Sequence, residues 1–254
     1  MLKNQKGSGL LWLIVVVAVF FVGLYIGRNG LEDEVKDIFS KENFFGTGKI
    51  ISEEFELEEF SRVDFDVAGN LYISQGEEQL VKVDADEKIM EKLIVEVRDG
   101  TLRVSLKPLT ISFVSVNVYV TIPDIDNLTI NGSGSIIGET PLTTENLDLR
   151  INGSGYVELD LDVKELDSTI AGSGEMNLKG STIRHSTNIE GSGDIKAAAL
   201  ATDSTSVNIE GSGSVKVVAE MDLDVNIEGS GDVEYSGKAT VIQKISGSGS
   251  VIEK

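Results

Sequence analysis

The sequence predicts an all-β protein, a parallel β-helix in which short strands coil around a common axis. Three observations predict this fold. The triplet Gly-Ser-Gly recurs seven times between residues 132 and 249, an isoleucine stands two residues before every triplet, and an apolar residue stands two residues after it. The intervals of 18 to 21 residues are typical of repeats that stack only on their neighbours. Polar and apolar residues alternate on both sides of the triplet, which is the period of a half-buried strand.

The repeated residues are expected to be structural. Glycine suits a bend because it adopts positive φ without a Cβ clash, and the isoleucines are expected to point inward and stack into a ladder. The expected turn residues are Gly132, Gly134, Gly153, Gly155, Gly172, Gly174, Gly191, Gly193, Gly211, Gly213, Gly229, Gly231, Gly247 and Gly249. The expected core ladder is Ile130, Ile151, Ile170, Ile189, Ile209, Ile227 and Ile245.

Residues 60–121 carry no triplet but alternate in the same way, and we expect them to cap the first end of the solenoid. Ala68-Gly69-Asn70 is expected to replace the triplet in a degenerate first coil. A short helix is expected over 86–93, a strand over 80–83 and a long strand over 113–122. The dipeptide Asp99-Gly100 predicts a tight hairpin, because it supplies the positive φ that such a turn needs.

The N-terminal segment predicts a membrane anchor. Residues 10–26 form a run of 17 residues without charge, preceded by Lys3 and Lys6 and followed by an acidic stretch. The run is long enough to cross a bilayer, and the positive-inside rule places the N-terminus in the cytoplasm. A cleaved signal peptide is the alternative, although no small-residue cleavage site follows cleanly. We expect a cytoplasmic tail over 1–9, a transmembrane signal-anchor helix over 10–27, an acidic juxtamembrane tether over 28–59 and the solenoid over 60–254.

Several of these motifs resemble the GIN-domain family. The resemblance rests on the strand at 60–65, the turn at 67–76, the hairpin at 95–102 and the later Asn-Gly-Ser-Gly and Glu-Gly-Ser-Gly turns. The family is described as the head of an autotransporter adhesin, on secreted or membrane-anchored bacterial proteins. The resemblance implies a right-handed parallel β-helix and an adhesion role, and it brings no binding residues to carry over.

Charge and composition exclude several function classes. The chain has 22 Lys and Arg against 42 Asp and Glu, a net charge of −20, which repels nucleic acid. It has no cysteine and one histidine, so neither a thiolate site nor a Cys/His zinc site can form. We expect His185 to be a solvated turn residue, with Ser181 and Ser186 merely nearby, and therefore no catalytic triad.

Two further chemistries stay open. Calcium could bind at Asp194, Asp232 and Glu175, which directly follow triplets, but four equivalent positions carry Ser or Tyr, so we expect no cofactor. A polysaccharide-acting enzyme would need a carboxylate pair such as Asp160 with Asp162. The repeats hold only Tyr156 and Tyr235 as rings for sugar stacking.

The sequence therefore predicts a single-pass bacterial membrane protein with an extracytoplasmic, non-enzymatic solenoid. Its expected role is adhesion, or binding of an envelope protein or polysaccharide, with oligomerisation left open. The alternatives are an envelope polysaccharide-acting enzyme on the same scaffold and a membrane-tethered envelope regulator.

Overall fold

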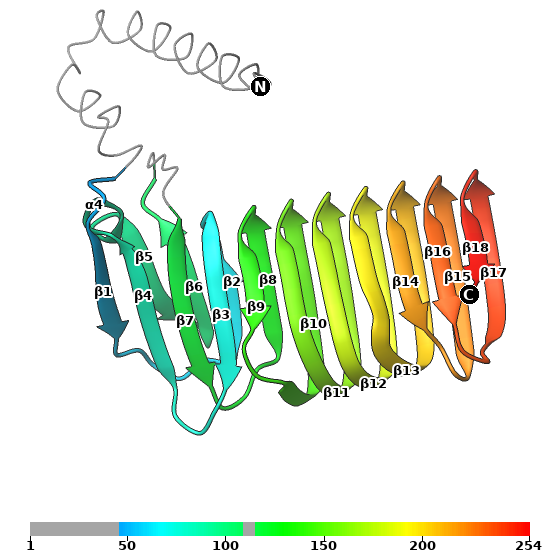
Figure 1. Ribbon diagram of the computed structural model, residues 1–254, viewed down its shortest axis with the longest axis horizontal. Coiled ribbons are helices and arrows are strands. Elements are labelled where there is room, and N and C mark those ends of the chain that lie inside the picture. The colour runs from blue at the N-terminus through cyan, green and yellow to red at the C-terminus, as the bar shows by residue number, and fades with distance from the viewer. Residues whose placement is uncertain (1–45, 109–114) are drawn as a thin grey trace, which may run out of the picture.

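The computed structural model describes residues 46–108 and 115–254, which form an all-β solenoid (Figure 1). The expected tail, transmembrane helix and most of the tether lie outside the described residues, as does the beginning of the strand expected over 113–122. Within the two described ranges, no helix is both long and apolar enough for a membrane crossing.

One short helix and a long series of strands make up these residues. In chain order they are β1 (Ile50–Phe55), β2 (Arg62–Phe65), β3 (Gly69–Gln75), β4 (Leu80–Asp86), α4 (Glu87–Met90), β5 (Leu93–Arg98), β6 (Thr101–Leu106), β7 (Val116–Ile122), β8 (Asn127–Gly132), β9 (Ser135–Gly138), β10 (Leu142–Gly153), β11 (Tyr156–Gly172), β12 (Glu175–Gly191), β13 (Asp194–Gly211), β14 (Ser214–Val218), β15 (Asp222–Gly229), β16 (Asp232–Ser236), β17 (Thr240–Gly247) and β18 (Ser250–Glu253).

Each turn of the solenoid, here called a rung, is a flattened coil with two edges (Figure 1). At the triplet edge the chain reverses tightly through Gly-Ser-Gly. At the opposite bend edge it turns more gently within one long strand, as β11 does from Tyr156 to Gly172. One residue per rung drops out of the strand register at this bend, for example Lys164 in β11 and Ile183 in β12.

The rungs stack as parallel strands in strict register, so equivalent side chains form columns along the axis. The isoleucine column runs from Ile130 through Ile151 and onward to Ile245. Its first six members are 0% exposed, but Ile245 is 38% exposed. The expectation of a buried Ile245 is wrong, because no described rung covers the last one.

The two glycines of a triplet are needed for different reasons. The first has positive φ in every rung, between 116° and 136°. A Cβ on Gly211 would also lie 2.2 Å from the carbonyl oxygen of Gly191. The second glycine does not have positive φ, contrary to the idea that both provide it. Instead, a Cβ on Gly213 would lie 2.7 Å from Cγ2 of Ile189 in the rung below.

The N-terminal end is closed by antiparallel strands. β1 pairs with β4, β4 with β7, and β5 with β6, all antiparallel. The predicted hairpin is confirmed, with positive φ at Asp99 and Gly100, and α4 lies within the predicted helix. β4 covers the strand predicted over 80–83. The expected cap is therefore present.

The order of rungs in space differs from their order in the sequence. β2 lies between β6 and β8, and β3 between β7 and β9, so the later β6 and β7 stack outside the earlier β2 and β3. The degenerate coil is present, since Phe65 pairs with Ile130 and Leu71 with Ile136. This register sets Val67 to Gly69 opposite the triplet, one residue earlier than predicted.

Asp86 ties the entering chain to the cap. Its side chain is 1% exposed and accepts hydrogen bonds from the backbone amides of Thr47 and Gly48, each at 2.7 Å, and of Lys88 at 3.0 Å. Burial alone would raise the pKa of Asp86, but these amides together hold it below its ordinary value.

Candidate binding groove at the bend edge

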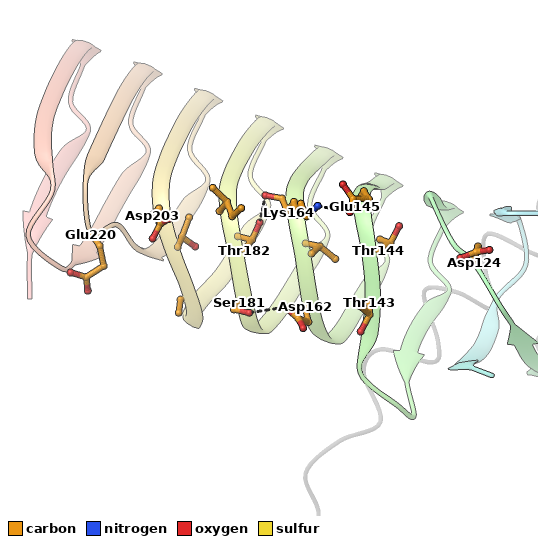
Figure 2. Close-up of a pocket in the computed structure, with 14 residues that line it drawn as sticks. Asp124, Thr143, Thr144, Glu145, Asp162, Lys164, Ser181, Thr182, Asp203 and Glu220 are labelled. Atoms are coloured by element: carbon orange, nitrogen blue, oxygen red, sulfur yellow. Dashed lines mark hydrogen bonds and ion pairs between the residues drawn. The ribbon is translucent and has the colours of Figure 1, made fainter. Parts of the chain in front are cut away.

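A groove of about 660 Å³ runs along the bend edge across four consecutive rungs (Figure 2). Three adjacent residues line it from each of the strands β10, β11, β12 and β13. Asp124, before these strands in the chain, and Glu220, after them, complete the lining. The lining is Asp124, Thr143, Thr144, Glu145, Asp162, Val163, Lys164, Ser181, Thr182, Ile183, Ala201, Thr202, Asp203 and Glu220. The groove is thus built from repeated positions of the solenoid, which the register holds at rung spacing.

The floor of the groove is a column of four side chains, and the hydroxyl groups of two of them, Thr182 and Thr202, contact backbone carbonyl groups. Thr144, Val163, Thr182 and Thr202 occupy this column. The Thr182 hydroxyl lies 3.1 Å from the Lys164 carbonyl oxygen and 3.0 Å from that of Arg184, and Thr202 donates to the Leu200 carbonyl at 3.2 Å. These contacts satisfy carbonyl groups at the bend, where the strand register is interrupted.

The rim of the groove is charged and open to solvent. Lys164 and Glu145 of neighbouring rungs form an ion pair, with Nζ and Oε1 2.5 Å apart. Ser181 donates to Asp162 at 3.1 Å across the next pair of rungs (Figure 2). The lining holds five carboxylates and one ammonium group, so its electrostatic character is acidic. Such a rim can donate and accept hydrogen bonds and attracts cationic groups.

The only histidine of the chain lies in the core, so the expectation of a solvated His185 is wrong. It is 1% exposed in β12, stacked in register between Leu166 and Thr205. Its Nε2 lies 3.0 Å from Oγ of Ser168, and Nδ1 has no hydrogen-bond partner in the described residues. Burial lowers the pKa of His185 to about 3. Ser168, and not the neighbouring Ser181 or Ser186, is its partner, and no carboxylate within 46–108 or 115–254 forms a hydrogen bond with the ring.

The predicted structural residues lie away from this groove. The glycine pairs form the triplet edge, where the backbone amides of successive turns bond to the rung below, for example Ser212 N to Gly191 O at 2.8 Å. The isoleucines beside them fill the core. Sequence reasoning singled out neither the groove column nor the bend residues around it, apart from Asp162 and Ser181.

The carboxylates considered for calcium and for catalysis are mostly engaged in ion pairs or hydrogen bonds. Glu175 pairs with Lys196 at 2.7 Å, Asp160 with Lys179 at 3.4 Å, and Asp232 accepts from Ser250 at 2.6 Å. In the two described ranges, no three Asp, Glu or His side chains gather in a way that could hold a metal ion.

Comparison with known proteins identifies relatives of the same shape. A protein described as a "putative adhesin" from Bacteroides fragilis superposes with a TM-score of 0.79 at 24% identity, over 83% of this chain and 100% of that one. A "putative lipid binding protein" from Parabacteroides distasonis gives 0.73 at 26% identity, over 83% and 99%. A "putative adhesin" from Parabacteroides merdae gives 0.67 at 24% identity, over 83% and 98%. No functionally curated protein matches the sequence.

A family model covers most of the solenoid. The model described as "Putative auto-transporter adhesin, head GIN domain" matches residues 59–239, which is more than half of the chain. The match begins just before β2 and ends just before β17, so it includes the degenerate rung, the groove and the cap except for β1. The chain therefore belongs to the GIN-domain family.

Proposed function

We propose that this chain is a membrane-anchored bacterial protein whose solenoid lies outside the cytoplasm and serves as a non-enzymatic adhesion module. The partner is an envelope protein or polysaccharide. Family membership and the adhesin-like relatives support the role. The uncharged run at residues 10–26, with its preceding lysines, supports the anchor and its orientation.

The observation that carries the proposal is the groove at the bend edge. Four rungs repeat the same three positions, so hydrogen-bonding side chains recur at the spacing of stacked strands, about 4.8 Å. An extended partner could follow these rows from rung to rung. The acidic rim favours a partner that carries amino or guanidinium groups.

The non-enzymatic assignment is supported by where reactive groups lie. General acid–base catalysis needs a titratable group within reach of the substrate. The single imidazole is buried, and Asp160 and Glu175 are held by lysines. Five carboxylates line the groove, Asp162 among them, so the polysaccharide-acting enzyme stays the alternative. Asp160, the expected second carboxylate, is not part of that lining and pairs with Lys179. The envelope regulator gains no specific support from this geometry.

The groove can be tested with a pair of charge-matched variants of the full chain. The groove variant carries Glu145→Gln, Asp162→Asn and Asp203→Asn. The control carries Glu190→Gln, Glu210→Gln and Glu228→Gln, which are exposed in one column next to the triplet edge. Cells that display each protein are incubated with labelled envelope polysaccharides and envelope proteins, with and without calcium.

We expect the groove variant to lose at least about tenfold in affinity, which is 1.4 kcal/mol, and the control to stay within about threefold. Equal losses in both variants would show that only net charge matters, and unchanged binding would reject the groove. New reducing ends in the polysaccharide would contradict the non-enzymatic assignment. Protease treatment of intact cells tests the orientation, because the solenoid should be cleaved only if it lies outside.

A further inference from the structure

The two ends of the solenoid are finished differently. At the N-terminal end, β1, β4 and β5 close the stack. At the other end, β17 pairs with β15 and β18 with β16, and no further strand of the described residues follows (Figure 1). The outer edges of β17 and β18 therefore present backbone amide and carbonyl groups without strand partners. Repeat proteins normally cover such an end with a polar cap.

The last rung is apolar where a cap would be polar. Ile245, Val241 and Val251 continue core columns and are partly uncovered. Ile242 and Ile252 point outward and are 66% and 50% exposed. These five aliphatic side chains surround the open end of the core.

Ile242 and Ile252 are apolar, whereas the residues beneath them in their columns are polar. In the five preceding rungs, the column of Ile242 is polar throughout: Asp148, Asp167, Ser186, Ser206 and Asp224. The column of Ile252 is polar in its five preceding rungs as well: Glu158, Asn177, Lys196, Lys216 and Glu234. The change to isoleucine on both faces of the last rung enlarges the apolar end, which is the opposite of what a solvent-facing cap requires.

Charge changes at the same place. Residues 222–235 contain five acids and no base, whereas residues 236–254 contain three lysines and one glutamate. Lys254 turns back to Glu234 of the rung beneath, with Nζ and Oε2 3.3 Å apart. In a chain with a net charge of −20, this end has a small excess of lysines, so two copies can meet there without bringing their acidic rungs together.

We propose that the open end docks on the same end of a second copy of this chain, forming a two-fold symmetric dimer. A two-fold axis across the end sets each edge strand antiparallel to its partner, so backbone donors and acceptors can pair. Gln243 continues an inward column at this end, and its amide is both donor and acceptor, so it can pair with its own copy. This inference is independent of the adhesion role.

The interface is small. The edge consists of eight residues in β17 and four in β18, which is less than the roughly 20–30 residues per side of a standard interface. The dimer is therefore expected to be concentration-dependent, with a dissociation constant in the micromolar range or weaker.

Position-specific cross-linking of the full chain in a mild detergent tests the contact, because the natural sequence has no cysteine. A Gln243→Cys variant should form a disulfide-linked dimer on mild oxidation. An Ile183→Cys variant is the control, since Ile183 is also exposed but lies at the bend edge of a central rung. Cross-linking of both variants at the same rate, or of neither, would overturn the proposal.

A second experiment measures the mass of the full chain against concentration by light scattering. Ile242→Lys should weaken association at least about tenfold, because it replaces an apolar side chain at the edge of the contact with a charged one. The matched Ile183→Lys should stay within about twofold of the parent. A monomeric parent at all accessible concentrations, or an equal effect of the two substitutions, would refute the end-to-end dimer. Among the residues that the structure describes, Ile242 is the most exposed large apolar one, so the variant should keep the fold, which circular dichroism checks.

Discussion

The buried histidine should make the solenoid sensitive to mild acid. His185 is 1% exposed, and burial lowers its pKa from 6.5 to about 3. The unfolded chain binds a proton at this side chain below about pH 6.5, whereas the folded chain stays neutral until the pH approaches 3. Because the unfolded state then holds more protons, the free energy of unfolding falls as the pH falls through this window.

The size of the effect follows from the two pKa values. For one group with an unfolded pKa of 6.5 that stays neutral in the fold, lowering the pH from 7 to 5 removes about 2 kcal/mol from the free energy of unfolding. Below about pH 5 carboxylates begin to titrate in the unfolded chain as well. The interval between pH 7 and 5 is therefore the one in which the histidine dominates.

The variant His185→Leu isolates this contribution. Leucine occurs in the same column at Leu166, so the side chain fits the ladder. The substitution leaves Ser168 without its partner, which lowers stability by an amount that does not depend on pH. Thr205→Val is the control, since it alters the next rung of the same column without removing a titratable group.

Urea unfolding of the three proteins at pH 7, 6 and 5 measures the slopes. The parent and Thr205→Val should lose stability with falling pH by about 2 kcal/mol more than His185→Leu. As a direct check, the Cε1 proton of the single histidine should keep its neutral chemical shift in the folded protein down to pH 5. A shift that titrates near pH 6.5, or parallel slopes for parent and His185→Leu, would refute the reasoning.

Three further predictions concern stability. Gly211→Val should lower the free energy of unfolding by more than about 1 kcal/mol, since φ is 133° and a Cβ would meet the Gly191 carbonyl; an unchanged urea midpoint would reject this account of the turn. Ile209→Ala should cost about 2–5 kcal/mol and Ile245→Ala clearly less, because the second is already partly exposed; equal thermal shifts would contradict the open end. Asp86→Asn should destabilise the protein at neutral pH, and the difference from the parent should shrink as the pH falls through the lowered pKa of Asp86; a difference that does not change with pH would exclude the role of the carboxylate.

The regular rungs could be predicted because one tight turn is repeated without change. The isoleucine before each triplet faces inward, and strict register then makes its column continuous. The order of the first rungs could not be predicted. Alternation of polar and apolar residues describes a half-buried strand equally well whether it pairs in parallel or antiparallel. The residues 62–106 therefore do not predict that β6 pairs with β2 on the side facing the N-terminal end of the solenoid.

The buried position of His185 could have been predicted by counting back from the isoleucine that precedes each triplet. Four residues before successive isoleucines stand Leu147, Leu166, His185, Thr205 and Leu223. All five are buried, with 3% exposure at most. The prediction of a solvated turn rested instead on the charged neighbour Arg184, which is on the outward side of the same strand.

The column that forms the floor of the groove was also missed, because its spacing is constant only when it is counted from the isoleucines. Seven residues before the isoleucines stand Thr144, Val163, Thr182, Thr202 and Glu220, a constant spacing. Counted forward from the second glycine of the preceding triplet, the same residues lie 7 to 10 positions away. The variation in repeat length is therefore confined to the strand that leads into the bend. β13 accommodates one extra residue there as a bulge between Lys196 and Ala199.

This difference between the two edges gives a physical reason for a binding surface at the bend. At the triplet edge, a Cβ on any first glycine after Gly132 would lie within 2.5 Å of the carbonyl below, so the residue type cannot change. At the bend edge, one residue per rung leaves the register and extends from the stack, as Lys164 and Ile183 do. Side chains there can vary without disturbing the core ladder. A solenoid of this kind therefore keeps its shape through one edge and can acquire new specificity through the other.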